Sequence, residues 1–233
     1  GRAEVLVARG PDGKASWGEA LARTSGRLSA FAVSPDGSAA IVSSPFLGDQ
    51  VLTALAPGGK VAWEKPLTST PPARFPTPAI EAIASDGRGG YYVQGPSSGE
   101  GGLDLGLGPL TGSGSFVARL DAQGRCLWER LFKEEYALSS DGAGSLLAIP
   151  AYAESEAPRA YEIDADGRVA RALDIDLPAA CRATKHPVTV QIAGGMTPAT
   201  VFVAVVCQER DETSMPQISI GKPAVFTGSL PRK

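Results

Sequence analysis

The stretch "SFVARLDAQGRCLWERLF", residues 115–132, alternates apolar and polar residues on both sides of a central Asp-Ala-Gln-Gly. Alternation with a period of two places every second side chain on one face of a strand. A short hairpin loop commonly closes on a residue in the left-handed conformation, which glycine adopts without steric cost. The stretch therefore predicts two antiparallel strands joined by a tight turn.

The same pattern occurs three more times, at residues 5–21, 51–67 and 160–175. Each copy has a strand, a glycine followed by a basic residue, and a second strand. The turn glycines are Gly13, Gly59, Gly124 and Gly167. A tryptophan stands four residues after the glycine in three copies, as Trp17, Trp63 and Trp128, and Arg171 replaces it in the fourth. A large aromatic side chain at a repeated position predicts packing between neighbouring sheets rather than ligand binding.

A second kind of hairpin lies between these copies, at residues 31–44, 82–94, 136–150 and 188–206. Asp-Gly, a strong hairpin signal, stands at 36–37, 86–87 and 141–142, and Gly194-Gly195 takes its place in the fourth. Aligning these pairs places Gly37, Gly87 and Gly142 in one register. The two kinds of hairpin alternate along the whole chain, which indicates a repeat of about 40–50 residues.

Two successive hairpins make a four-stranded antiparallel sheet, and a series of such sheets is typical of a β-propeller. The sequence predicts an all-β propeller forming a single domain over residues 1–233, with about five blades unless the chain is a fragment of a larger propeller. Whole blades are expected at 29–68, 82–132 and 136–175. Incomplete or shared blades are expected at 1–28 and 186–233.

Residues 101–132 resemble the β-propeller repeats of predicted secreted proteins from myxobacteria and related bacteria. The phrase "LAPGGKVAW" (55–63) is also similar to the strand motif of quinoprotein-type propellers and of outer-membrane assembly lipoproteins. The resemblance implies a bacterial protein that is secreted, periplasmic or on the outer surface. It implies no activity, and no catalytic residue can be carried over.

Composition limits the chemistry that the chain can perform. The net charge of the 233 residues is −3, and no segment clusters Lys and Arg, so a nucleic-acid partner is not expected. No apolar run is long enough to span a bilayer. The chain begins at Gly1 without a signal peptide, and a leader removed from a longer precursor is one expectation. The single histidine, His186, excludes a His-rich zinc or iron site, and a Ser-His or Cys-His pair would have to use it. Neither a metal nor a cofactor is expected.

The three cysteines have no metal-ligand spacing. Cys181 and Cys207 flank the last hairpin of the second kind and would pair as a disulfide in an oxidising compartment. Cys126 holds an alternating strand position, as expected of a small buried side chain. Asp164 and Asp166 lack the further oxygen ligands of a calcium loop and are interpreted as residues of a hairpin turn.

The glycine-rich segment 95–114 is the longest insertion in the repeat. Its "GPSSG" (95–99) matches Gly-x-Ser-x-Gly around Ser97, but no helix can follow, as an esterase would require. We interpret the segment as a flexible loop between two strands. Loops on a rigid scaffold commonly bind partners, so Glu100 and Asp104, its only charged residues, are candidate contact residues.

The sequence favours a non-enzymatic binding or structural module that presents loops to another protein or to a neighbouring copy of the chain. One alternative is a binder of a sugar or metal at the mouth of the propeller channel. Another is a hydrolase or quinoprotein-like enzyme. The fold by itself does not separate these functions.

Overall fold

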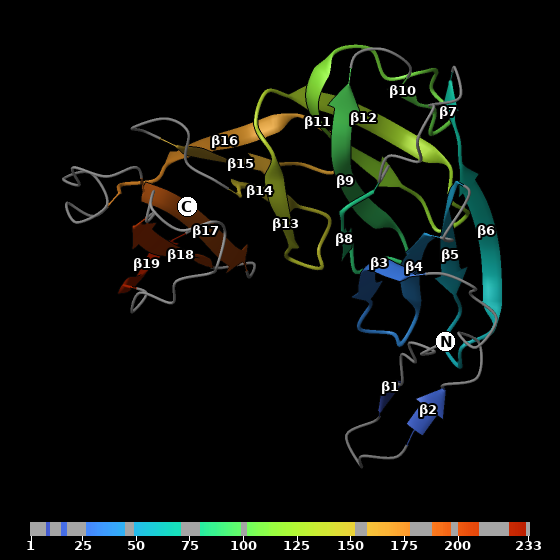
Figure 1. Ribbon diagram of the computed structural model, residues 1–233. Helices are drawn as coiled ribbons and strands as arrows, with labels where there is room; N and C mark the ends of the chain where they lie inside the picture. The colour runs from blue at the N-terminus through green and yellow to red at the C-terminus, as the bar shows by residue number, and fades with distance from the viewer. Residues whose placement is uncertain are drawn as a thin grey trace. The chain divides into compact units, whose positions relative to one another are not determined.

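The computed structural model describes residues 8–9, 15–17, 27–44, 49–70, 80–98, 102–151, 158–177, 188–196, 200–209 and 224–231 (Figure 1). All helical or strand structure within these ranges is β-strand. The chain divides into two compact units, residues 1–133 with 142–144, and residues 134–141 with 145–233. The expected single domain over 1–233 stays a prediction.

The first unit contains two four-stranded antiparallel sheets. Sheet 1 pairs its strands in chain order: β3 (Arg27–Val33), β4 (Ala39–Ser44), β5 (Gln50–Leu55) and β6 (Val61–Leu67). Sheet 2 does the same with β8 (Ala82–Ser85), β9 (Tyr91–Ser98), β11 (Ser113–Leu120) and β12 (Cys126–Phe132). Two short pairs join β1 (Ala8–Arg9) to β2 (Ala15–Trp17), and β7 (Ser69–Thr70) to β10 (Gly102–Leu103).

The second unit contains a third four-stranded sheet and a three-stranded one. Sheet 3 consists of β13 (Tyr136–Ser140), β14 (Leu146–Pro150), β15 (Arg159–Ile163) and β16 (Val169–Asp174). Sheet 4 consists of β17 (Val188–Met196), β18 (Thr200–Glu209) and β19 (Ala224–Pro231). Three four-stranded meanders of this kind resemble propeller blades, and the all-β fold class predicted from the sequence is confirmed.

The tight turns of the three four-stranded sheets share one geometry of five residues. In each turn the amide of the first residue donates a hydrogen bond to the carbonyl of the fifth, over 2.8–3.2 Å. The fourth residue is a glycine with positive φ in all six turns: Gly37, Gly59, Gly89, Gly124, Gly144 and Gly167. The left-handed glycine that the sequence predicts at Gly59, Gly124 and Gly167 is confirmed, with φ of 82°, 76° and 79°.

The register that the sequence suggested for the second kind of hairpin is wrong by two residues. Gly87 and Gly142 occupy the second turn position, and Gly89 and Gly144 are the equivalents of Gly37. The error has a physical cause, because the glycines at the second position also have positive φ, 73° for Gly87 and 69° for Gly142. Asp-Gly marks the turn correctly in each case, but not the same place within it.

Aspartate is the first residue in four of the six turns, where its side chain accepts hydrogen bonds from main-chain amides of the same turn. Asp121 Oδ1 accepts hydrogen bonds from the amides of Gln123 and Arg125, each over 2.9 Å, and Asp164 repeats this arrangement. A short polar side chain bonded to the backbone two residues on replaces water at amides that the hairpin leaves unpaired. Asp164 therefore belongs to an ordinary hairpin turn, as the sequence predicts.

Replacing Asp121 by alanine is expected to lower the free energy of unfolding by about 1–2 kcal/mol, because the two amides lose their acceptor. Partial burial raises the pKa of the Asp121 carboxyl, but the hydrogen bonds from Arg125 and Gln123 outweigh it and hold that pKa below its ordinary 3.8. The stabilisation is therefore present above pH 3.8 and is lost as the pH falls through the lower folded-state value. Urea titrations at pH 7 and pH 2.5 measure both effects.

Asp166→Ala is the matched control, since Asp166 is the third residue of an equivalent turn and its exposed carboxylate contacts only the exposed Arg168 among the described residues. We expect this variant to unfold with the wild type. Equal losses of stability for Asp121→Ala at both pH values would contradict the role given to the carboxylate.

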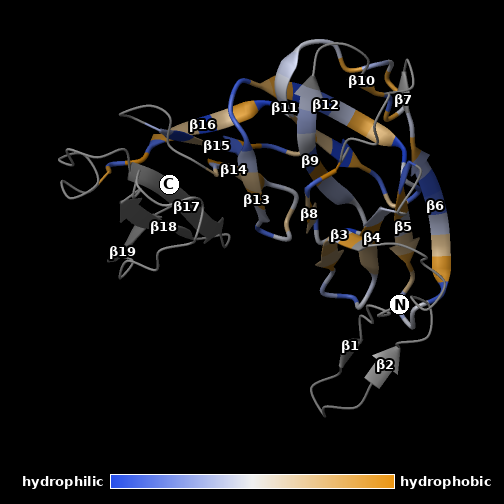
Figure 2. Cartoon of the chain, viewed as in Figure 1, coloured by the Kyte–Doolittle hydropathy of each residue, from blue (hydrophilic) through white to orange (hydrophobic). Residues whose placement is uncertain are grey.

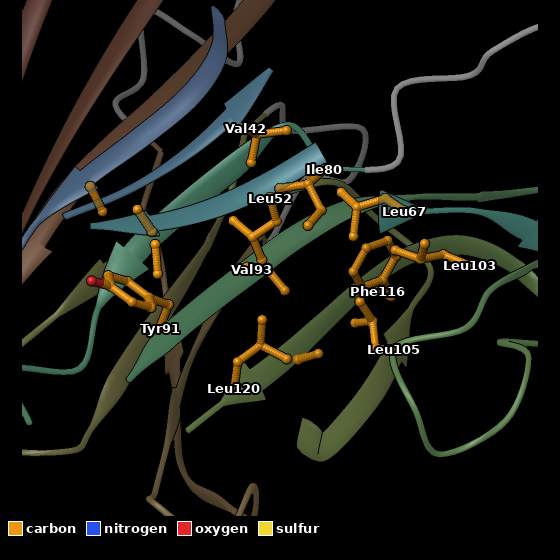
Figure 3. Close-up of a cluster of buried hydrophobic side chains, with 14 of the residues drawn as sticks. Val42, Leu52, Leu67, Ile80, Tyr91, Val93, Leu103, Leu105, Phe116 and Leu120 are labelled. Atoms are coloured by element: carbon orange, nitrogen blue, oxygen red, sulfur yellow. The ribbon is translucent and has the colours of Figure 1, made fainter. Parts of the chain in front are cut away.

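The core of the first unit lies between sheets 1 and 2, and it follows from the alternation read in the sequence. Phe116, Ala118 and Leu120 of β11 face it, as do Leu52 and Ala54 of β5 (Figure 3). The last strand of sheet 1, β6, shows hydrophilic residues over much of its length (Figure 2). The side chains of β6 that point toward sheet 2 therefore fill the outer part of the interface between the two sheets.

Trp63 of β6 lies between the two sheets. Its indole Nε1–H donates a 2.8 Å hydrogen bond to the carbonyl of Ala122, in the turn that ends sheet 2's third strand. A Cβ at Gly124 would approach the Trp63 ring to 3.1 Å, so glycine serves this turn through both its conformation and its small size. The side chain of Trp17 is outside the described residues. Trp128 has its ring centroid 6.0 Å from that of Tyr92 in the same sheet.

Arg171, which stands at the tryptophan position of sheet 3, makes an ion pair instead. Its Nη2 lies 3.0 Å from Glu162 Oε2, directly across the β15–β16 pair. The fourth copy of the hairpin thus keeps the backbone of the repeat and changes its side-chain chemistry.

A buried ion pair joins β11 to the turn between β8 and β9 in sheet 2. Arg119 Nη2 lies 2.8 Å from Asp86 Oδ2, and both side chains are nearly inaccessible, at 12% and 3% exposed. Asp86 Oδ1 accepts bonds from the amides of Arg88 and Gly90, so each oxygen of the carboxylate has partners. The Arg119 guanidinium also lies 5.7 Å from the centroid of the Tyr92 ring. A fully partnered charge pair of this kind fixes β11 against the β8–β9 turn.

Candidate interaction surface: the wedge insertion

The connection between β9 and β11 is shorter than the sequence suggested. β9 continues to Ser98 and β11 begins at Ser113, so strand pairing covers Gly95–Ser98 and Ser113–Gly114. Between them, β10 pairs with β7 of the segment after sheet 1 (Figure 1). We call residues 102–112 the wedge insertion. The interpretation as a loop is wrong for Gly95–Ser98 and Ser113–Gly114, which lie in β9 and β11, while residues 102–112 belong to the connection between these strands.

Three apolar side chains of the wedge insertion lie in the core of the first unit. Leu103, Leu105 and Leu110 are 7%, 0% and 6% exposed, and all three belong to the core between sheets 1 and 2. Figure 3 shows Leu103 and Leu105 beside Phe116 of β11. The insertion therefore fills the space between the last strands of the two sheets, β6 and β12, with its own leucines.

Asp104 closes the wedge insertion on itself. Its Oδ1 accepts hydrogen bonds from the amides of Gly106, over 2.7 Å, and Gly108, over 3.1 Å. Asp104 also forms an isolated antiparallel bridge with Pro109. The carboxylate thus holds the shape of the loop in addition to its exposed position as a candidate contact residue. Glu100, the other candidate, is outside the described residues.

Lys65 of β6 anchors the insertion from the opposite sheet. Its ammonium donates hydrogen bonds to the carbonyl of Leu105 and, over 3.3 Å, to that of Gly124. A partly buried ammonium costs less when its protons have such partners. The role of Lys65 was not predicted, because a lysine in an alternating strand is expected to face solvent.

The tip of the wedge insertion presents one apolar side chain to solvent. Leu107 is 54% exposed, the largest exposed fraction among the large apolar residues that the structure describes. It stands between Gly106 and Gly108, whose φ values are 111° and 106°. A leucine fixed on a loop that is anchored by three buried neighbours and a carboxylate cap loses little conformational entropy when a partner covers it.

Ser97, the centre of the Gly-x-Ser-x-Gly match, lies inside β9 opposite Gly114. It is 8% exposed, and its Oγ donates a hydrogen bond to the carbonyl of Gly112. The strand continues through the motif, so the sharp strand-to-helix turn of an esterase nucleophile does not occur at these residues.

The structure describes some of the other residues that the sequence singled out and not others. Cys181 and His186 are outside the described residues, as is the side chain of Cys207, so the predicted disulfide stays a prediction. Cys126 packs against the core of the first unit, and burial raises the pKa of its thiol to about 11. Across the described ranges, no three His, Cys, Asp or Glu side chains are grouped as metal ligands would be. Those ranges also hold no helix with the length and hydropathy of a membrane span.

These observations define the class of protein: an all-β chain with three four-stranded, propeller-type sheets, whose strands are connected by a common five-residue turn. No family model matches the sequence, and no curated protein matches it either. Solved structures with a similar chain path include a protein of unknown function from Bacteroides caccae, with 13% identity and a TM-score of 0.49. The match covers 86% of this chain and 64% of that protein.

Two further solved structures have a comparable path. BamB from Moraxella catarrhalis has 12% identity and a TM-score of 0.43, over 84% of this chain and 53% of that one. Hydrazine synthase from Kuenenia stuttgartiensis has 16% identity and a TM-score of 0.40, over 91% of this chain and 64% of that one. The chain thus spans between half and two thirds of each protein, and the fold class rests on the three sheets themselves.

Proposed function

We propose that this protein is a non-catalytic binding module that docks another protein through the wedge insertion. The observation that carries the proposal is the contrast within residues 103–110. Three leucines and a capped carboxylate hold the loop in place, while Leu107 projects into solvent. Apolar side chains on rigid supports are the residues that contribute most to protein–protein binding.

The chemistry of the tip favours a protein pocket as its counterpart. Neither Gly106, Gly108 nor Pro109 carries a charge, and the nearby Lys65 is bonded to two carbonyls. An anionic membrane surface is recognised by clustered basic residues beside an apolar face, which this loop does not have. The expected location is outside the cytoplasm of a bacterium, secreted, periplasmic or on the outer surface, as the resemblance of residues 101–132 implies.

Site-specific photo-crosslinking in the source organism tests the proposal. A photoreactive residue at position 107 is expected to give one discrete protein adduct. The same residue at position 61 is the control, because Val61 is also half exposed, at 51%, but lies at the start of β6. Identical adducts from both positions, or no adduct from a correctly folded and located protein, would overturn the assignment of the tip.

Once the crosslinked protein is purified, Leu107→Ser provides a direct test of affinity. Loss of a buried leucine from a contact is expected to weaken binding by roughly tenfold or more, without a change in melting temperature. Turnover of simple chromogenic esters or glycosides by the wild-type protein would contradict the non-catalytic part of the proposal.

A further inference from the structure

Glu129 of β12 shares a strand face with Leu131, whose side chain lies against Gly112 at the end of the wedge insertion. It stands on β12 directly opposite Ala118 of β11, on the face that carries Cys126 and Leu131 toward the insertion. Its Oε2 atom is inaccessible and has no hydrogen-bond partner among the described residues. A buried carboxylate oxygen without a partner is costly when ionised and much less so when protonated.

The charged groups around Glu129 do not compensate it. Lys65 of β6 directs its ammonium to the carbonyls of Leu105 and Gly124 rather than to Glu129. From the insertion, Asp104 adds a second negative charge. On β12 itself Cys126 has a thiol pKa of about 11 and is neutral at ordinary pH, and β11 contributes the uncharged Ala118. Burial and then the charge of Asp104 raise the pKa of Glu129 above its ordinary 4.5.

We propose that Glu129 is a proton-operated latch for the wedge insertion: protonated, it lets residues 102–112 sit closed between β6 and β12, and ionised, it favours their opening. In the closed state the carboxyl is enclosed and faces Asp104, and in the open state water solvates it. This regulation concerns how firmly the insertion is held, so it does not depend on what the Leu107 tip binds.

The direction of the effect follows from proton linkage. The closed state binds the Glu129 proton more tightly than the open state does, so closing is favoured at low pH. Between about pH 4.5 and the raised value of the closed state, closing takes up a proton, so each step up in pH favours opening. A single group changes the opening equilibrium by at most about tenfold per pH unit.

Hydrogen–deuterium exchange of peptides from residues 102–112, measured from pH 5 to pH 8, tests the latch. After correction for intrinsic exchange rates, protection of the wild-type insertion is expected to fall several-fold as the pH rises. Peptides from β14 serve as an internal reference, because this strand is buried throughout and remote in sequence. Glu129→Gln keeps the shape of the side chain and is expected to make protection of the insertion independent of pH.

Two further variants separate the latch from general effects of substitution. Glu64→Gln removes an exposed carboxylate from β6 and is expected to behave as the wild type. Asp104→Asn keeps an oxygen acceptor for the turn amides and is expected to reduce the pH dependence, because it removes the neighbouring negative charge. A flat profile in the wild type, or an unchanged slope in Glu129→Gln, would overturn the proposal.

Discussion

Replacing Leu105 by alanine is expected to lower the free energy of unfolding of the first unit by about 2–5 kcal/mol. Leu105 is completely buried, and its side chain is part of the core between sheets 1 and 2. The truncation leaves a cavity that the neighbouring main chain cannot close, because Lys65 and the Asp104 turn hold it from both sides. Urea unfolding followed by the fluorescence of the tryptophans measures the change.

The same loop supplies the control. Leu107 is two residues away and more than half exposed, so Leu107→Ala removes the same atoms without leaving a cavity. It is expected to change the unfolding free energy by less than about 0.5 kcal/mol. If Leu105→Ala were as stable as Leu107→Ala, the insertion would be a free loop after all.

Replacing Arg119 by methionine is expected to cost about 3–5 kcal/mol, because it leaves the carboxylate of Asp86 buried and without its cation. Methionine keeps much of the volume of the arginine stem, so the loss reports the charge rather than the packing. Asp86 keeps the amide bonds to Oδ1 but loses both guanidinium bonds to Oδ2. Thermal and urea unfolding at pH 7 measure the difference.

The double variant Asp86→Asn, Arg119→Met distinguishes a missing charge from general damage. Removing both charges is expected to recover part of the stability that the single variant loses. Arg159→Met is the exposed counterpart: Arg159 pairs with Asp174 at the surface, with 58% and 73% of the side chains exposed, and little change is expected. A double variant less stable than Arg119→Met would contradict the account of a stranded charge.

The hairpins could be predicted from sequence because their signals are local. Alternation fixes which side chains point inward, and a left-handed glycine has few substitutes, so Gly59, Gly124 and Gly167 identified their turns directly. Where two glycines with positive φ stand in one turn, as at Gly142 and Gly144, the local signal no longer tells which one closes it. The wrong register came from that degeneracy.

The wedge insertion could not be predicted, because what decides its structure lies far away in the sequence. Glycine content alone reads as flexibility, while the burial of Leu105 depends on the space that sheets 1 and 2 leave between β6 and β12. One local signal was present: Leu103, Leu105 and Leu107 alternate with Asp and Gly in the manner of a strand. The role of Lys65 could not be predicted, because its acceptors are the main-chain carbonyls of Leu105 and Gly124. Every residue has such a carbonyl, so the sequence does not mark which ones Lys65 binds.

Trp63 and Lys65 both end on main-chain oxygens, at Ala122, Leu105 and Gly124. A substitution at Ala122 alters the side chain but leaves the acceptor of the Trp63 bond where it was. The side chains of β6 therefore determine these hydrogen bonds, and Ala122 can change without removing its acceptor. Gly124 cannot, because its φ is 76° and a Cβ there would approach the Trp63 ring to 3.1 Å. The sequences of neighbouring repeats can in this way diverge beyond recognition before the hydrogen bonds between their sheets are lost.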